Sequence, residues 1–319
     1  MSGFRKSLKQ RIRWLANFPR YGPVGLHDPQ REVRVRLLGL DETLDVTCNN
    51  VVAALRPFTI GVMLRSGHSE DLNGRPLRLC MHERDGAECL LGVIHLRFVQ
   101  SIPLPEHRLC LFEAPRFENF CVDALKLRLY DRYEQWLADR RQGSNPHNFL
   151  MAADDVRCSH VFYICPRPVV LVTVEHEGAG NMFPMDLIGP TDSPWYTMAL
   201  RSTSPAARLM QQSRRMALAS IPLSLKAAAY EMGKHHKKTN IDWASLPFPT
   251  AASPLFGLRV PVAALRIREV RVVDSHEVGS HILFITSIEH ETLVPLDSRM
   301  QLFHRFSSYR CHLLHEEAV

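Results

Sequence analysis

The sequence predicts a mainly β protein with flanking helices, built on antiparallel sheet. Short runs rich in Val, Ile, Leu and Phe recur from residue 31 onward, over 32–38, 59–64, 76–82, 88–99 and 107–112. Asn73-Gly74 and Asp85-Gly86 lie between such runs and are dipeptides that favour tight hairpin turns. The gaps are too short for crossover helices, so the strands are expected to form an antiparallel barrel or sandwich.

Two helices are expected beside these strands. The first 20 residues hold six Lys or Arg and no acidic residue, and Phe4, Leu8, Ile12 and Leu15 recur at helical spacing. This pattern indicates a basic amphipathic helix that packs on the protein body, binds a membrane surface or targets an organelle. Residues 118–142 have the pattern of a second helix, which a Gly-Ser-Asn-Pro run at 143–146 ends. We therefore expect two domains, 1–150 and 151–319, joined by this linker helix.

The composition limits the classes of function. The chain has 319 residues, of which 45% are hydrophobic and 23% charged, and its net charge of +6 favours anions in general. No uncharged apolar run of about 18 residues exists, so no transmembrane segment is expected. No zinc-finger spacing or RNP motif is present, so no specific nucleic-acid partner is expected. Eight cysteines without a C-x-x-C pair, and no signal peptide, predict a reduced cytoplasmic protein without a metal site.

The segment from 180 to 204 carries the strongest signal for a ligand. The run Asn181-Met182-Phe183-Pro184-Met185-Asp186-Leu187 is interrupted by proline and cannot be regular helix. A short apolar strand follows over 196–200 and ends on Arg201-Ser202-Thr203-Ser204. Backbone N–H groups, hydroxyls and a guanidinium suit a phosphate-bearing planar cofactor, because each donates hydrogen bonds to an anion. Pro205 suits the first turn of a helix whose N-terminus would favour the same phosphate.

The order of these features resembles the flavin reductase-like FMN-binding split-barrel family. Segments 219–222, 233–242, 279–284 and 302–309 resemble further family motifs in the expected order. The resemblance implies an antiparallel Greek-key split β-barrel in which residues 181–187 pass over the isoalloxazine ring of FMN. It also implies that Arg201, Ser202, Thr203 and Ser204 hold the phosphate. His236 and Lys237, in the densest cationic cluster, would hold that phosphate or the pyrophosphate of a nicotinamide donor.

Each of these segments also has a plainer interpretation. Residues 182–187 can form a bulged loop packed on core Met and Phe, the Ser/Thr run can be a simple helix cap, and the His-Lys cluster can be a solvated loop. Asp186 stands where the family usually has a small or hydroxyl residue. An acid beside a reduced anionic flavin is unfavourable, so Asp186 is expected to point away from the ring.

A short internal match indicates that the fold occurs twice in tandem. Residues 59–66 and 195–202 are both apolar strands that end on Leu-Arg-Ser and follow a Pro-containing turn. A chance match between two barrels is the alternative. The N-terminal half lacks counterparts of the cationic segment and of the closing strands, so it resembles a degenerate copy. Members of the family are usually homodimers with FMN between subunits. A fused pair would form that interface as an intramolecular pseudo-dimer; a homodimer of whole chains is the other possibility.

The function implied by the resemblance is that of an FMN-dependent oxidoreductase. The first hypothesis is a flavin reductase that takes hydride from NADH or NADPH and passes electrons to free flavin, oxygen or a partner. The alternatives are an FMN-dependent oxidoreductase acting on a specific organic substrate and a non-catalytic flavin-binding or interaction protein. No G-x-S-x-G, P-loop or G-x-G-x-x-G motif is present, and no catalytic side chain is assigned.

Overall fold

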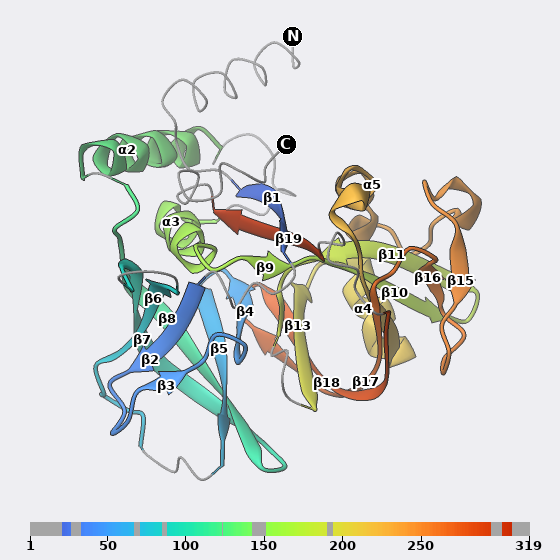
Figure 1. Cartoon of the computed structure of the whole chain (residues 1–319), viewed down its shortest axis with the longest axis horizontal. Helices are drawn as coiled ribbons and strands as arrows, with labels where there is room; N and C mark the ends of the chain where they lie inside the picture. The colour runs from blue at the N-terminus through green and yellow to red at the C-terminus, as the bar shows by residue number, and fades with distance from the viewer. Residues whose placement is uncertain are drawn as a thin grey trace.

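The computed structural model describes residues 21–26, 33–66, 71–84, 88–122, 124–141, 151–189, 194–294 and 302–307. The predicted basic helix of residues 1–20, the Asp85-Gly86 turn and the 143–146 linker lie outside these residues. Figure 1 shows two curved antiparallel sheets side by side, with helices above and around them. The predicted fold class, mainly β with two tandem half-barrel sheets, is confirmed.

The two large sheets have the same topology. The first half contains β2 (Val33–Leu38), β3 (Leu44–Asp45), β4 (Asn50–Leu55), β5 (Phe58–Arg65), β6 (Leu77–Glu83), β7 (Leu90–Leu104) and β8 (His107–Asn119). The second half contains β10 (Val170–His176), β11 (Ala179–Met185), β12 (Ile188–Gly189), β13 (Trp195–Arg201), β14 (Arg215–Ser220), β17 (Arg266–Val278) and β18 (His281–Leu293). The sheet orders are β3-β2-β6-β7-β8-β5-β4 and β11-β10-β14-β17-β18-β13-β12. Numbered along each half, both read 2-1-5-6-7-4-3, which is the arrangement expected of a duplicated fold.

The internal match noted in the sequence occupies equivalent places in the two sheets. β5 and β13 are each the fourth strand of their half, and each ends beside the start of the seventh strand. Arg65 is in register with His107, just as Arg201 is in register with His281. The backbone N–H of the following serine donates to a turn carbonyl in both halves, at 2.9 Å for Ser66 and 3.2 Å for Ser202. A chance match would not reproduce these register pairs.

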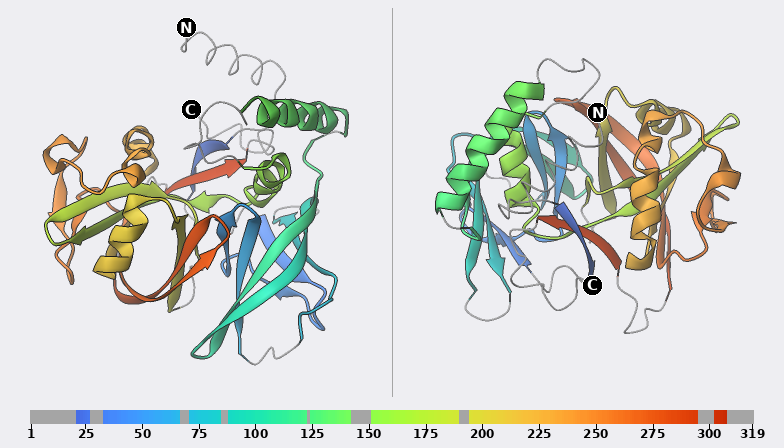
Figure 2. Two further views of the ribbon diagram at one scale, coloured as in Figure 1. Left: turned by 180° about the vertical axis from the view of Figure 1, so that it is seen from behind. Right: turned by 90° about the horizontal axis from the view of Figure 1, so that it is seen from above.

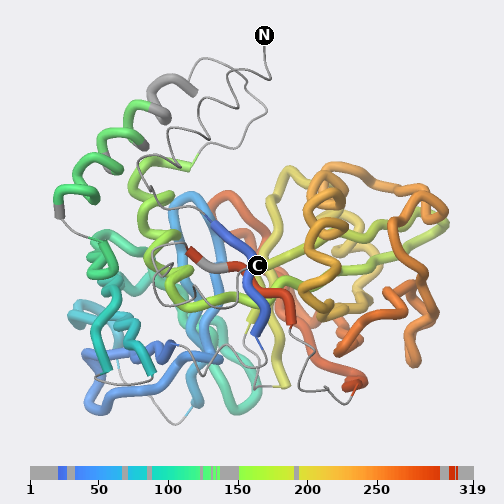
Figure 3. Tube along the Cα trace, turned by 45° about the horizontal axis from the view of Figure 1, so that its top comes forward, coloured from blue at the N-terminus to red at the C-terminus, as the bar shows by residue number. Residues whose placement is uncertain are grey.

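A third, three-stranded sheet joins the ends of the chain. In it β19 (Leu302–Ser307) lies between β1 (Tyr21–Leu26) and β9 (Arg167–Pro168). Figure 3 shows β1 in blue and β19 in red at the centre of the molecule, between the two halves. A small separate hairpin, β15 (Thr250–Ala252) with β16 (Arg259–Pro261), lies at the outer side of the second half (Figure 1).

The helices lie outside the sheets. They are α2 (Ala124–Arg141), α3 (Ala153–Phe162), α4 (Pro205–Ser213) and α5 (Lys226–Met232), with the short helical turns η2 (Leu223–Leu225), η3 (His235–Lys237) and η4 (Trp243–Ser245). The start expected for the linker helix, residue 118, is wrong, because Glu118 still belongs to β8, where it pairs with Val93. Figure 2 shows α2 and α3 over the first half and α4 and α5 beside the second.

Residues after 150 contribute to the core of the first half. Cys158, Val161, Phe162 and Ile164 are at most 1% exposed and pack in one cluster with the inward-facing residues of β2, β5 and β6. The strand residues alternate between buried and partly exposed in β2, as expected for a sheet with one covered face. The domain boundary at 150 remains a prediction, and α3, which begins after it, packs in the core of the first half.

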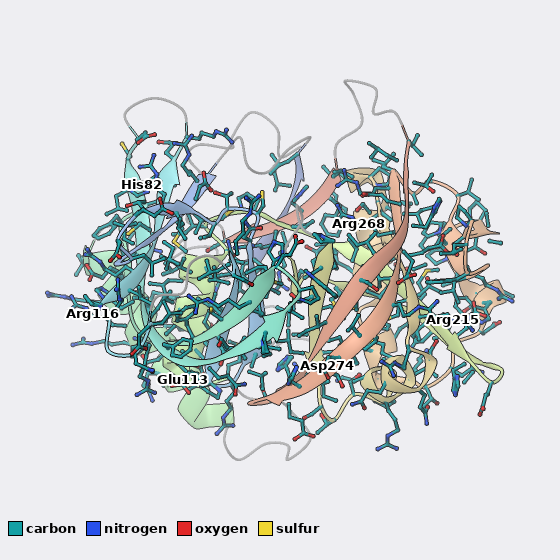
Figure 4. The ribbon with its side chains drawn as sticks, turned by 90° about the horizontal axis from the view of Figure 1, so that it is seen from below. His82, Glu113, Arg116, Arg215, Arg268 and Asp274 are labelled. Carbon is teal, nitrogen blue, oxygen red and sulfur yellow. The ribbon has the colours of Figure 1, made fainter. Side chains whose placement is uncertain are left out.

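The two halves meet through an apolar interface. Its buried cluster combines Ala53, Ala54, Met63, Leu109 and Leu111 of the first half with Ala199, Leu283 and Ile285 of the second. Most of these residues come from the third, fourth and seventh strands of their halves. At Gly279 a Cβ atom would lie 2.4 Å from the carbonyl oxygen of Arg56, so only glycine allows this approach. Figure 4 shows His82, Glu113 and Arg116 on one side of this junction and Arg215, Arg268 and Asp274 on the other.

Candidate functional site

A cavity of about 300 Å³ lies beside this junction. Most of its lining comes from the second half: the β11–β12 connection, the end of β13, the start of β18, α5 and β19. The first half contributes Leu55, at the end of β4. The apolar lining includes Leu55, Val169, Leu187, Ala199, Leu200 and Phe303. The polar lining consists of Asp186, Arg201, Tyr230, His236, His281 and Arg305. These polar groups fall into two sets that interact within themselves.

The first set contains Arg201, His236 and His281, in which Arg201 supplies the positive charge. Arg201 and His281 are register partners on β13 and β18, and burial lowers the pKa of Arg201. Burial, with a smaller effect of Arg201, lowers the pKa of His281 to about 4. Burial is also the main cause that lowers the pKa of His236. Since desolvation penalises the charged form, these side chains would gain from an anion brought into the cavity.

The two histidines of this set have different protonated nitrogens. His236 Nδ1 lies 2.7 Å from the carbonyl oxygen of Gly233, which only accepts, so Nδ1 carries the proton. Leu55 N–H approaches His281 Nδ1 at 3.5 Å, and the Ser280 hydroxyl lies 2.9 Å from the same nitrogen, so Nδ1 accepts and Nε2 carries the proton. Neutral His281 therefore retains an N–H donor at Nε2, whereas His236 gains one there only on protonation.

The second set is an ion pair among tyrosines. Arg305 NH1 donates to Asp186 Oδ2 at 2.6 Å, and the guanidinium lies 4.1 Å from the ring centroid of Tyr21 and 5.5 Å from that of Tyr163. Burial would lower the pKa of Arg305, but Asp186 and the two tyrosines raise it overall. Burial raises the pKa of Tyr21 to about 12, so its hydroxyl stays neutral at physiological pH. The Asp186–Arg305 ion pair therefore has no net charge.

Six of the residues expected at the site line this cavity, namely Pro184, Met185, Asp186, Leu187, Arg201 and His236. Asp186 lines the cavity and forms an ion pair with Arg305 there, and its orientation relative to a bound ring stays a prediction. Met182 and Phe183 do not form the wall: both are 0% exposed and belong to separate core clusters. The plainer interpretation, packing on core Met and Phe, holds for these two residues, because β11 is covered on both faces.

The other expected residues surround the cavity without lining it. Asn181 is buried, and its Nδ2 donates to the carbonyl oxygens of His235 at 2.8 Å and Lys238 at 2.7 Å. The Ser204 hydroxyl donates to the carbonyl oxygen of His236 at 2.5 Å. Both side chains therefore fix the η3 segment that carries His236. Ser202, Thr203 and Lys237 are exposed and do not line the cavity.

Several lining residues were not expected from the sequence. His281 and Arg305 lie inside segments that resemble family motifs, so a signal for them existed. Phe303 lies in the same segment as Arg305, whereas Tyr230 lies in none of these segments. Leu55 could not be found from sequence, because it reaches the cavity only through packing of the two halves, 226 residues away from His281.

Comparison with known proteins gives neither a matching family model nor a matching curated relative. Similar solved structures are flavin proteins. An FMN-binding protein from Thermus thermophilus with bound p-hydroxybenzaldehyde is 20% identical with a TM-score of 0.39, over 51% of this chain and 87% of its own. An NADH:FAD oxidoreductase from Streptomyces globisporus is 16% identical with a TM-score of 0.43, over 51% and 94%. A flavin reductase in its native state is 19% identical with a TM-score of 0.38, over 48% and 93%. Likeness at these values transfers no ligand or activity to this chain.

The described residues lack two features of other classes of protein, a membrane-spanning helix and a cluster of metal ligands. Among the helices described, none combines the length and apolar character needed to cross a membrane. Within the same part of the chain, no three His, Cys, Asp or Glu side chains are grouped so that they could hold a metal ion.

Proposed function

We propose that the chain is an FMN-binding oxidoreductase of the flavin reductase type, which takes hydride from NADH or NADPH. The observation that carries the proposal is the division of one cavity into two ends. Arg201, His236 and His281 form a partly desolvated cationic end, and aromatic and apolar side chains with a neutral ion pair form the rest. A ligand that fits has an anionic group attached to a planar, largely apolar body.

FMN has this composition, and the residues present suit it. Arg201 remains charged and offers a fork of donors for a phosphate, and His281 adds the N–H of its Nε2. His236 becomes a further donor when it is protonated beside the anion. Leu55, Leu187 and Phe303 would exclude water from the ring. A volume of about 300 Å³ is at the lower end of the range of small-molecule sites.

In the proposed reaction, the bound cofactor supplies a ring that accepts a hydride from the dinucleotide and passes the electrons on. The chain itself binds, orients and excludes water. Asn181 and Ser204 hold the η3 segment in place, so that His236 stays at the cationic end. Asp186 holds Arg305 against the wall, so that no unpaired charge faces the ring. The preferred dinucleotide and the final electron acceptor are left open in this proposal.

Two alternatives belong to the same site. An FMN-dependent oxidoreductase with its own organic substrate would use the aromatic end for that substrate, and a non-catalytic flavin-binding protein would use the cavity only for binding. We place the protein in the cytoplasm, since reduced thiols persist there. Among the described residues, Cys80, Cys89, Cys110 and Cys158 are free thiols.

The test is a flavin absorbance spectrum of the purified full chain after incubation with FMN and gel filtration. NADH or NADPH is then added under anaerobic conditions. Flavin that comigrates with the protein and bleaches with either dinucleotide supports the proposal. Retained flavin that neither dinucleotide reduces favours one of the alternatives. Failure to retain FMN refutes flavin binding at this site.

A further inference from the structure

The Asp186–Arg305 pair forms part of the cavity wall and is held from several directions. The two side chains are 16% and 34% exposed, and the bond between them measures 2.6 Å. Tyr21 of β1 and Tyr163, directly after α3, lie against the guanidinium, and Tyr163 also forms a hydrogen bond with Asp186. Four separate chain segments therefore fix the pair, which makes rearrangement around Arg305 unfavourable.

This arrangement has a consequence for a second ligand in the same cavity. A carboxylate that took the place of Asp186 on Arg305 would leave the mostly buried carboxylate of Asp186 without its cationic partner. Loss of one member of such a pair is strongly unfavourable. An anion that does not displace Asp186 meets a wall without net charge. An uncharged ligand avoids both difficulties.

Tyr230 supplies a surface for such a ligand. The side chain lies on α5, lines the cavity and is 55% exposed. One edge contact with Phe303, at 5.8 Å between ring centroids and 68° between the planes, fixes the ring. An exposed aromatic ring at a cavity binds planar molecules by stacking, and the apolar lining of Phe303 and Val169 continues the surface inward.

We propose that the aromatic end accepts a planar, uncharged second ligand stacked on Tyr230, and that the Asp186–Arg305 pair discriminates against carboxylates. The inference rests on the proposed function in one respect, that a flavin occupies the remainder of the cavity. A bound FMN phosphate would also balance Arg201, so an anionic second ligand would find no excess positive charge in the cavity.

Benzamide and benzoate test this directly, because they have nearly the same shape and differ in charge at neutral pH. Each is titrated by calorimetry into the FMN-loaded chain and, without FMN, into the Arg201→Ala variant, in which benzoate has no Arg201 guanidinium to bind. Benzamide is expected to bind about tenfold more tightly than benzoate, a difference of about 1.4 kcal/mol. Equal or tighter binding of benzoate overturns the proposal, and so does the absence of binding by either compound.

Variants assign the effect to the named residues. Tyr230→Ala should weaken benzamide binding about tenfold, because a stacked aromatic contact is lost. Tyr230→Phe retains the ring and should leave the Kd for benzamide within about twofold. Asp186→Asn leaves Arg305 charged without its carboxylate, so benzoate should gain about tenfold and benzamide should change little. If Asp186→Asn does not fold, the double variant Asp186→Asn/Arg305→Gln restores a neutral pair and should keep the preference for benzamide. A preference unchanged in Asp186→Asn, or reversed in the double variant, contradicts the assignment.

The outcomes separate the two proposals. If the chain retains no FMN, the flavin proposal fails, while the titrations of Arg201→Ala still decide whether the aromatic end prefers the uncharged compound. If FMN binds and benzoate binds as well as benzamide, the discrimination by Asp186 and Arg305 fails and the flavin proposal is unaffected.

Discussion

Replacement of Arg201 by alanine is expected to weaken FMN binding and to leave riboflavin binding nearly unchanged. Arg201 is partly buried at the cationic end of the cavity, where burial disfavours its charge and an anion would restore favourable interactions. A hydrogen bond to a charged group contributes about 1.5–3 kcal/mol. That range corresponds to about a ten- to hundredfold increase in Kd. Riboflavin has the same ring and no phosphate, so it isolates this contribution.

The assay is quenching of flavin fluorescence during titration with the full chain, at constant ionic strength. Arg65→Ala is the matched control, since Arg65 is in register with His107 in the first half just as Arg201 is with His281 in the second. The control should leave Kd for FMN within about twofold, because Arg65 does not line the candidate cavity. Equal losses for riboflavin and FMN would show that Arg201 is structural. An equal loss in Arg65→Ala would remove the distinction between the two halves.

Three further predictions concern stability, each measured by denaturant unfolding. The pKa of His281 is about 4 in the folded chain and 6.5 otherwise, so the unfolded chain binds an extra proton between these values. His281 should therefore leave the unfolding free energy undiminished above pH 6.5 and lower it by about 2 kcal/mol at pH 5. His281→Gln should remove that decrease, and an unchanged pH profile in the variant would refute the assignment. Glu269 is 0% exposed and accepts hydrogen bonds of 2.6–2.8 Å from the Ser253 hydroxyl and two backbone N–H groups. Glu269→Ala should therefore lower the unfolding free energy by about 3 kcal/mol. A decrease below about 1 kcal/mol would contradict this role. Gly279→Ala should lower the unfolding free energy by more than Gly178→Ala, because both glycines have positive φ but only at Gly279 would a Cβ atom meet backbone. Equal decreases would show that the contact between Gly279 and Arg56 is not tight.

The sequence was a good guide to the strands, because short apolar runs between turn residues mark both an alternating strand such as β2 and a fully buried one such as β5. Residues 32–38 and 59–64 correspond closely to β2 and β5. The 118–142 helix was placed too early, because the charged end of β8 has the polar composition of a surface helix. The short Leu-Arg-Ser match was informative because strand register preserves it in both halves.

The predicted residues that line the cavity come from two segments, 184–201 and the cationic segment that holds His236. Residues 184–187 and 201 were located from a single segment, and they do line the cavity. Contributions from Leu55 and Tyr230 depend on how distant elements pack, which no local pattern records. Met182 and Phe183 were predicted at the site but belong to the core. Apolar residues next to a ligand-binding segment can line the site or pack in the core, and only the burial of β11 on both faces shows that these two pack in the core.

The central claim is that this chain forms one flavin site, built by the second half and bordered by the first. The most direct measurement is the stoichiometry of FMN binding to the full chain at protein concentrations well above Kd, followed by absorbance after removal of free flavin. The account predicts one FMN per chain, with binding abolished or greatly weakened by Arg201→Ala and retained in Arg65→Ala. Two flavins per chain would show that the first half has kept its own site, and no bound flavin would contradict the account altogether.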